Sequence, residues 1–243
     1  MKKIIKYLID KTIVKFYKYL IFKSGIFTKK DFNKKLTIHK VLWDKAIVDS
    51  SVYVENRIDK ILLFEQKNDL WNYTISKIKN KEGLNLEFGV FKGLSINYFS
   101  SRLPNLKFYG FDSFIGLKED WIGHHRAKGA FNLEGILPKV SKNVELIPGW
   151  FDETIPNFIK KYPNEKISFL HIDGDTYEAA KIVLELLKSK IGVGTLIVFD
   201  EYLGYPNWRN GEFKAWGEFV KENNIKYNYI AFSTEQAAII ITD

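Results

Sequence analysis

Acidic residues follow two β-type runs in the second half of the chain. Asp173 and Asp175 come at the end of one run, and Asp200 and Glu201 come at the end of the next. Because the carboxyl ends of neighbouring parallel strands lie roughly 5 Å apart at one edge of a sheet, these carboxylates are expected to converge. Clustered carboxylates repel one another and favour Mg²⁺ or a similar hard cation. The sequence therefore predicts a metal site with Asp173, Asp200 and Glu201 as ligands, and capping of the following helices is the alternative role for these acids.

A glycine-containing turn follows an earlier β-type run. Glu87 precedes Gly89, and Gly93 and Ser95 stand where the next helix is expected to begin. Glycine lets the backbone approach a ligand, and a helix N-terminus offers N–H donors to a carboxylate. A dinucleotide-binding turn would need the spacing G-x-G-x-x-G, which this turn lacks. Glu87 instead suits the charged amino group of S-adenosylmethionine (SAM), although a turn that needs glycine only for its geometry remains open.

Two further strand ends carry residues that suit the rest of such a cofactor. Asp112, with Ser113 beside it, follows a β-type run, where a carboxylate could hold a ribose diol or could cap a turn. Gly149 and Trp150 end the next run, and an aromatic ring there suits the edge of an adenine pocket or plain core packing. We therefore count all four residues as candidates for cofactor binding, together with the residues of the glycine turn and with Asp173.

The elements that must position these residues alternate between β-type and helical runs. The β-type runs span residues 84–90, 107–114, 144–150, 167–173 and 195–200, and helices are expected over 95–102, 151–161 and 177–190. Two closing runs, 227–232 and 237–242, are joined by four residues and must pair antiparallel. This pattern predicts an α/β fold with a doubly wound, mostly parallel, seven-stranded, Rossmann-like sheet.

Residues 1–80 are expected to form a helical extension, and residues 81–243 are expected to form the catalytic domain. Lysines interrupt the apolar residues of 1–30 too often for a membrane-spanning helix, and at helical period they make a basic amphipathic helix. This helix is expected either to pack on protein, including a second copy in a homo-oligomer, or to lie on an anionic membrane surface. We expect a cytoplasmic protein, with peripheral membrane contact left open.

Composition narrows the classes of function. The 243 residues are 46% hydrophobic, which suits one domain with an extension, and the absence of cysteine leaves only Asp, Glu or His as metal ligands. The net charge of +8 would attract phosphate-bearing ligands, anionic lipid or nucleic acid. Much of the lysine excess lies in the first forty residues, however, and no base-reading module is recognisable, so a nucleic-acid partner is not expected.

From about residue 84 onward, the ordered motifs resemble the macrocin O-methyltransferase family, whose members are metal-dependent SAM enzymes that tailor sugars on macrolide and aminocoumarin antibiotics. The matching stretches are residues 87–90 with Gly93 and Ser95, 111–117, Gly149 with Thr154, 171–175, 199–202, and Glu212 with Lys214 and Ala215. The resemblance implies the class I methyltransferase fold and Mg²⁺ held by the acids of the two later strand ends. It also implies SAM contacts at four residues: Glu87, Gly89, Ser95 and Asp112. The family often has two aspartates where this chain has Asp200 and Glu201.

The expected function is SAM-dependent O-methylation of a hydroxyl on a sugar or a glycan-linked small molecule. Mg²⁺ would lower the pKa of the hydroxyl, and Asp173 would take its proton. The polar segment 116–131 is long for a connection and is expected to cover the substrate, with His124 or His125 as second-choice base; a solvated loop is the alternative. Three aromatic residues could form a wall for a sugar ring or could be buried: Tyr202, Tyr205 and Trp208. Rival functions are a catalytically silent methyltransferase-like scaffold, a membrane-associated binding protein and a nucleic-acid methyltransferase.

Overall fold

The computed structural model describes residues 37–243, and the chain divides into a unit of residues 1–42 and a unit of residues 43–243. The predicted amphipathic helix of residues 1–30 lies outside the described residues. Across residues 37–243, no helix is long and apolar enough to cross a membrane. Residues 43–80 belong to the same unit as the sheet, and a domain boundary near residue 80 stays a prediction.

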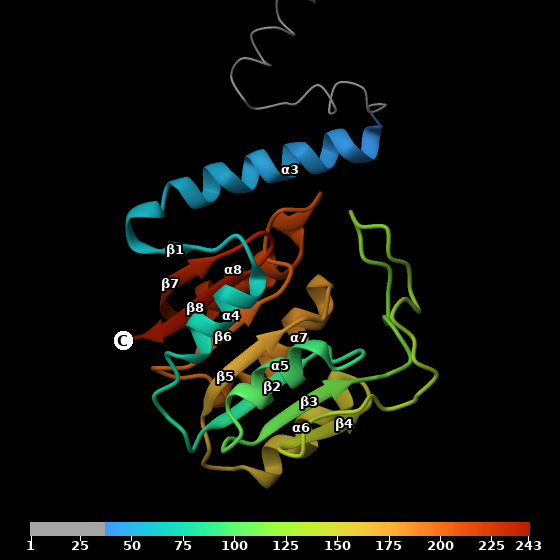
Figure 1. The fold of residues 1–243 in the computed structure, drawn as a ribbon, viewed down its shortest axis with the longest axis vertical. Helices are drawn as coiled ribbons and strands as arrows, with labels where there is room; N and C mark the ends of the chain where they lie inside the picture. Colours follow the sequence, from blue (N-terminus) through green and yellow to red (C-terminus); the bar gives the residue numbers. More distant parts are fainter. Residues whose placement is uncertain (1–36) are drawn as a thin grey trace, which may run out of the picture. The chain divides into compact units, whose positions relative to one another are not determined.

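A mixed sheet of eight strands forms the centre of the second unit, in the order β1-β7-β8-β6-β5-β2-β3-β4 (Figure 1). The strands are β1 (Leu62–Leu63), β2 (Leu84–Phe88), β3 (Phe108–Asp112), β4 (Val144–Pro148), β5 (Ile167–Ile172), β6 (Leu196–Phe199), β7 (Lys226–Phe232) and β8 (Ala237–Thr242). β8 runs antiparallel to both of its neighbours, β6 and β7, while the other described pairs are parallel. The predicted mostly parallel α/β sheet is therefore confirmed.

The expected number of strands was one too few. β1 pairs in parallel with the end of β7 and extends the sheet at that edge. It is only two residues long, so it shows none of the alternation by which a strand is recognised in a sequence. Because β1 lies between helical stretches, the helical extension expected for residues 1–80 did not include a strand.

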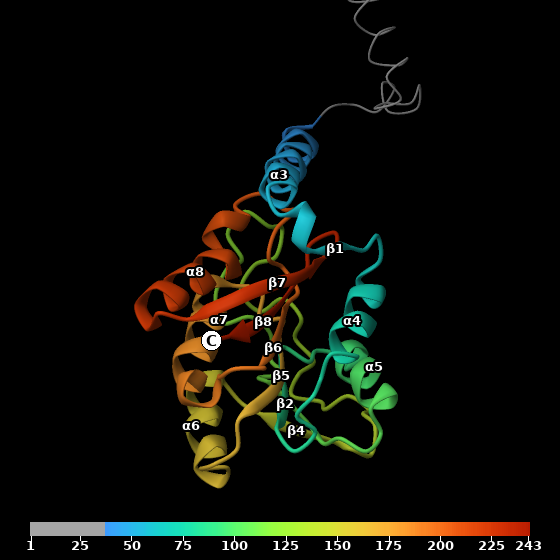
Figure 2. The same cartoon turned by 90° about the vertical axis from the view of Figure 1, so that its left-hand side faces the viewer.

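Helices cover both faces of the sheet. The helices of the described residues are α3 (Ile38–Glu55), α4 (Lys67–Ile75), α5 (Leu94–Arg102), α6 (Phe151–Lys161), α7 (Tyr177–Leu187) and α8 (Glu212–Asn223), with short 3-10 turns at Ile58–Lys60, Lys188–Lys190 and Trp208–Asn210. Figure 2 shows α4 and α5 on one face and α6, α7 and α8 on the other. Each face packs its own apolar cluster, which contains Trp71 and Phe99 on the first and Phe158 and Trp216 on the second. The pattern does not predict α8, because Gly217 interrupts it.

The strand order reverses at β2 and β5, where the chain first proceeds toward β3 and β4 and later toward β6. Backbone bonding continues past the strand ends, since the N–H of Asp173 donates to the carbonyl of Phe88 at 2.8 Å. Gly89 has a φ of +97°, and a Cβ placed there would lie 1.7 Å from the carbonyl oxygen of Asp173. Only glycine fits at this point, which is where ligands bind in open α/β sheets.

We predict that Gly89→Ala destabilises the protein by at least about 2 kcal/mol, because the new side chain meets backbone atoms and adopts a disfavoured φ. Gly217→Ala is the matched control, since within the described part of the chain nothing approaches its added Cβ within 4 Å. It lies in α8 and should be neutral or stabilise by up to about 1 kcal/mol. Urea unfolding of both variants measures the difference, and equal stabilities would contradict the close approach.

Candidate active site

A cavity of about 650 Å³ opens at the carboxyl ends of β2, β3, β5 and β6. This volume lies within the range of pockets that bind cofactors and drug-sized ligands. The lining brings together eight of the residues predicted from the sequence: Gly89, Asp112, Ser113, His124, Trp150, Asp173, Asp200 and Glu201. These residues come from separate segments and meet because the strands that precede them are neighbours in the sheet.

Five other predicted residues are not among those that line the cavity: Glu87, Gly93, Ser95, Gly149 and His125. Gly93 and Gly149 have positive φ angles and stand just before α5 and α6, so each shapes a strand-to-helix turn. His125 is exposed on the loop after β3. The binding and catalytic roles expected of these five residues stay predictions.

Asp112 organises the backbone of the turn after β2. One of its carboxylate oxygens accepts hydrogen bonds from the N–H groups of Val90 and Phe91 at 2.8 and 2.7 Å, and the other accepts one from Phe114 at 2.7 Å. A carboxylate has about four lone-pair sites, so one acceptor position remains for a ligand. Asp112 thus fixes the turn and still faces the cavity.

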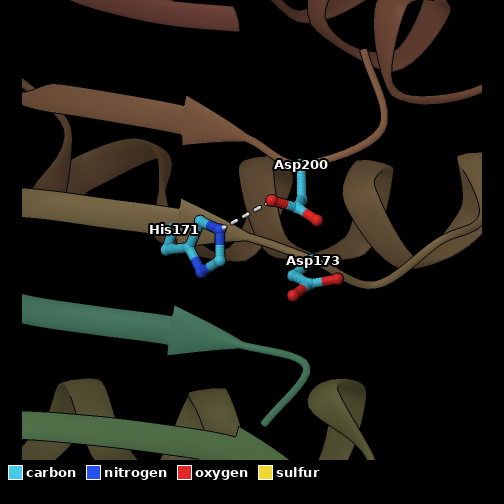
Figure 3. Close-up of side chains that lie close together, drawn as sticks. All are labelled: His171, Asp173 and Asp200. Atoms are coloured by element: carbon cyan, nitrogen blue, oxygen red, sulfur yellow. Dashed lines mark ion pairs between the residues drawn. The ribbon is translucent and has the colours of Figure 1, made fainter. Parts of the chain in front are cut away.

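A buried chain of polar contacts lies behind the cavity wall. Ser95 donates from its hydroxyl to Glu87 Oε1 at 2.9 Å, and Glu87 Oε2 shares a hydrogen bond of 3.0 Å with His171 Nδ1. On its other side, His171 Nε2 lies 3.6 Å from Asp200 Oδ1, the contact drawn in Figure 3. Burial alone would lower the pKa of His171, but the carboxylates of Asp200 and Glu87 on its two sides raise it to about 10. His171 is therefore a buried cation between two acids.

His171 was not among the candidates from the sequence. It stands in an apolar strand, and the register of the sheet places it directly opposite Glu87. A charged residue inside an apolar strand needs a partner nearby. Matching the two strands by their charged residues would therefore have paired His171 with Glu87 from the sequence.

Three carboxylates form the centre of the acidic cluster. Oxygens of Asp173, Asp175 and Glu201 all lie within 4.8 Å of one another. Asp200 projects from the neighbouring strand end and pairs instead with His171 (Figure 3). It also pairs with Lys67, whose Nζ lies 3.4 Å from Asp200 Oδ2. A second possible ligand group combines Asp200 with Asp173 and His171. Asp175, Lys67 and His171 are the three residues of this cluster that the predicted site omits.

The charges of the cluster are only partly balanced. Burial and the nearby Asp200 carboxylate raise the pKa of Asp173 well above its usual value, and burial with Asp173 does the same for Glu201. Burial and Asp200 raise the pKa of Asp175 to about 8. Burial would also raise the pKa of Asp200, but the bonds and charges of His171 and Lys67 lower it below its usual value. Asp173, Asp175 and Glu201 therefore resist ionising together, and a cation beside them would offset that resistance.

The cluster fits a hard divalent cation. Glu201 Oε2 is buried and has no hydrogen-bond partner among residues 37–243, so this oxygen has a free lone pair at the cluster. The donor set is all oxygen, which suits Mg²⁺, Mn²⁺ or Ca²⁺ better than a soft metal. The ligands predicted from the sequence are Asp173, Asp200 and Glu201, and this assignment stays a prediction.

The connection from β3 to β4 forms the wall opposite the strand ends. It spans residues 113–143, and within it the structure shows only an isolated bridge between Ile115 and Asn132. Trp121 is nearly buried and stacks on His124, with ring centroids 3.9 Å apart. His124 and Arg126 line the cavity, so the long connection contributes to the site.

The three aromatic residues after β6 belong to the interior. Tyr202, Tyr205 and Trp208 are each no more than 2% exposed, and none of them lines the main cavity. Core burial, the alternative considered for them, is therefore what the structure shows, and Tyr205 in addition borders a smaller cavity. Tyr202 shares a hydrogen bond with Tyr229 of β7, which ties the segment to the sheet.

The strand order, the antiparallel β8 and a cavity at the reversal point together define the class I methyltransferase fold. Residues 86–202, just under half of the chain, match the profile of a family described as "Methyltransferase domain". The match spans β2 to β6 and most of the residues around the acidic cluster. This stretch of the chain is therefore similar to a methyltransferase domain, and its similarity to two curated O-methyltransferases agrees with the predicted family resemblance.

Two curated relatives match shorter stretches. A segment of 85 residues, 34% of this chain and 31% of the relative, is 33% identical to demethyldecarbamoylnovobiocin O-methyltransferase of Streptomyces niveus. A segment of 59 residues, 24% of this chain and 21% of the relative, is 32% identical to 8-demethyl-8-(2,3-dimethoxy-alpha-L-rhamnosyl)-tetracenomycin-C 4'-O-methyltransferase of Streptomyces olivaceus. The chain thus spans about a third or less of the length of the curated relatives that it matches.

Solved structures share the fold over a longer stretch. The calicheamicin methyltransferase CalS11, also described as a TDP-rhamnose 3'-O-methyltransferase, is 22% identical and aligns with a TM-score of 0.61 over 73% of this chain and 79% of its own. The O-methyltransferase NovP is 19% identical and aligns with a TM-score of 0.55 over 73% of this chain and 80% of its own. At this level of identity the likeness establishes the fold.

We predict that His171→Gln destabilises the protein by about 3 kcal/mol at pH 6, because it removes a buried cation from between two acids. A group whose folded pKa is raised from 6.5 to about 10 contributes stability that is complete below pH 6.5 and is lost as the pH rises through 10. The difference between wild type and variant should therefore shrink between pH 6 and pH 9.5.

Urea unfolding at both pH values measures this difference. His125→Gln is the control, since His125 is exposed and its replacement should change stability little at either pH. A difference for His171→Gln that stays the same at both pH values would show that His171 is neutral in the folded protein.

Proposed function

We propose that this chain is a SAM-dependent O-methyltransferase that acts on a hydroxyl of a sugar or a sugar-linked small molecule, assisted by a divalent cation. The observation that carries the proposal is the position of the acidic cluster in the same cavity as the glycine turn after β2. The turn suits the methyl donor, and the cluster suits a cation that activates a hydroxyl. A silent scaffold would not need several buried acids that repel one another.

The names of the similar proteins support an acceptor that contains a sugar. Both curated relatives are named as O-methyltransferases, and the name of the Streptomyces olivaceus enzyme includes a rhamnosyl group. CalS11 is named for TDP-rhamnose, a nucleotide-linked sugar. These names leave open whether the sugar is attached to an aglycone or to a nucleotide. They give no support to nucleic acid as the acceptor of this chain.

The first part of the cavity would hold SAM. Gly89 allows the backbone to approach the ligand closely, and the remaining acceptor site on Asp112 can bind a ribose hydroxyl. Trp150 and Phe151 line the cavity beside them and offer aromatic surface to the adenine. Glu87, expected to contact the amino group, is instead buried against Ser95 and His171, where it supports the turn from behind. A direct contact from Glu87 to SAM stays a prediction.

The second part of the cavity would hold the cation and the reacting hydroxyl. Asp173 and Glu201 would bind the cation together with Asp200 or Asp175, and when bound the ion lowers the pKa of a hydroxyl and orients it. His171 and Lys67 keep Asp200 ionised and fix its direction. Asp173 is the first candidate to take the proton from the hydroxyl, and His124, which lines the same cavity, is the second. The loop of residues 113–143 would exclude water around them.

A cytoplasmic location, homo-oligomer formation and peripheral membrane contact through residues 1–30 belong to the same proposal. The basic amphipathic pattern of that segment supports the last two. None of the three is needed for methyl transfer in the cavity of the second unit.

We predict that SAM binds the wild-type protein in calorimetric titration with and without Mg²⁺, and that transfer of labelled methyl to a sugar acceptor requires the metal. Asp200→Asn should keep SAM binding and lose at least about a hundredfold in methyl transfer, because cation assistance is worth several kcal/mol. Asp59→Asn is the control, since Asp59 is exposed in the 3-10 turn at Ile58–Lys60. Absence of SAM binding, or activity that is equal in EDTA and in Mg²⁺, would refute the proposal.

A further inference from the structure

A second cavity of about 470 Å³ adjoins the main one. The two share five lining residues: Glu119, Trp121, Asp175, Thr176 and Glu178. The remaining walls of the second cavity come from the β3–β4 connection, the first residue of α7, the loop after β6 and the start of α8. Tyr205, Gly211 and Lys214 belong to the last two of these segments. Both cavities border Asp175 and Trp121, so the second cavity lies directly beside the main one.

Tyr205 offers an unused polar group to the second cavity. Its side chain is 1% exposed, and its hydroxyl has no hydrogen-bond partner in the described part of the chain. The hydroxyl lies against Gly211, where an added Cβ would come within 2.2 Å of it. A buried hydroxyl nearly always has a partner, so a ligand hydroxyl or amine in this cavity is the group that would supply one.

The lining of both cavities is strongly acidic although the whole chain has a net charge of +8. Nine acidic side chains line the main cavity against three basic ones, which are Lys67, Lys118 and Arg126. Two of these bases are already paired, Lys67 with Asp200 at 3.4 Å and Lys118 with Asp152 at 3.0 Å. A divalent cation and the net positive charge of SAM would together offset only about half of the acidic excess.

The second cavity has the same imbalance and no cofactor to offset it. Four acidic side chains line it, namely Glu119, Asp120, Asp175 and Glu178, against the single base Lys214. Lys214 Nζ also lies 3.8 Å from Glu218 Oε1 on α8, and this carboxylate offsets part of the positive charge of Lys214. A phosphate or diphosphate here would face carboxylates at close range, and such like-charge contacts cost several kcal/mol.

We infer that the second cavity binds the part of the acceptor next to the methylated hydroxyl, and that this acceptor is a neutral or amine-bearing sugar, not a phosphorylated or nucleotide-linked one. The inference rests on the proposed function and narrows its substrate class. Tyr205 bonds a ligand hydroxyl or amine, and Glu119 and Glu178 at the shared wall exclude phosphate. The positive net charge of the whole chain therefore does not predict the charge of the ligand that this cavity binds.

Ligand-observed NMR on the full chain tests this inference without turnover. The protein is loaded with Mg²⁺ and S-adenosylhomocysteine, and three probes are compared: methyl α-L-rhamnoside, methyl α-D-glucosaminide and dTDP-rhamnose. We expect the first two probes to bind and the nucleotide-linked sugar to bind at least about tenfold more weakly. Equal or tighter binding of dTDP-rhamnose overturns the inference, and so does binding of none of the three.

Two variants locate the effect in the second cavity. Glu178→Lys should reduce the ratio of the dissociation constants of dTDP-rhamnose and methyl α-L-rhamnoside at least about fivefold. The reason is that lysine replaces a charge that repels the diphosphate by one that attracts it. Glu185→Lys is the control, since Glu185 lies on the same helix α7 outside both linings. Tyr205→Phe should lower the affinity for methyl α-L-rhamnoside about three- to tenfold and leave the affinity for S-adenosylhomocysteine unchanged. Equal effects of the two lysine variants, or no effect of Tyr205→Phe, count against the site.

The same samples separate this inference from the proposed function. Loss of S-adenosylhomocysteine binding to the wild-type protein would refute the proposed function itself. Retained S-adenosylhomocysteine binding together with a preference for dTDP-rhamnose would leave methyl transfer standing and would reject only the neutral or amine-bearing acceptor.

Discussion

Repulsion among buried carboxylates at the carboxyl ends of β5 and β6 is the interaction on which the site depends. Asp173, Asp175 and Glu201 lie within 4.8 Å of one another, and removing such charges from water costs free energy unless a cation is near. His171 and Lys67 supply positive charge on the side of Asp200 only. The remaining acids therefore need either protons or a metal ion, and the function that we propose for the cavity requires the metal ion.

The fold places this cluster next to the methyl-donor part of the cavity through backbone geometry. Strands β2 and β5 are neighbours at the point where strand order reverses, and Gly89 lets them approach closely. The buried contacts from Ser95 through Glu87 and His171 to Asp200 join the two parts of the site. A change at either end of this chain of contacts should therefore be felt at the other.

Periodicity and strand-end chemistry predicted most of the fold and much of the site. The long β-type runs carry clear patterns, so their order, the closing antiparallel pair and the meeting of Asp173 with Glu201 could be foreseen. β1 could not, because two residues show no period. Lys67 and His171 were missed for a different reason, since their roles depend on which strands and helices become neighbours. Glu87 shows the limit of motifs: its type was recognised, but its burial against His171 is a tertiary fact.

Anomalous diffraction from crystals grown with Mn²⁺ is the most direct test of whether the cluster binds a divalent cation. We predict one strong peak bonded to carboxylate oxygens of Asp173 and Glu201 at about 2.2 Å, with Asp200 or Asp175 completing the protein ligands. Crystals that contain Mn²⁺ but show no peak among these acids would mean that protons, not a metal, neutralise the cluster, and the proposed activation of the hydroxyl would be wrong.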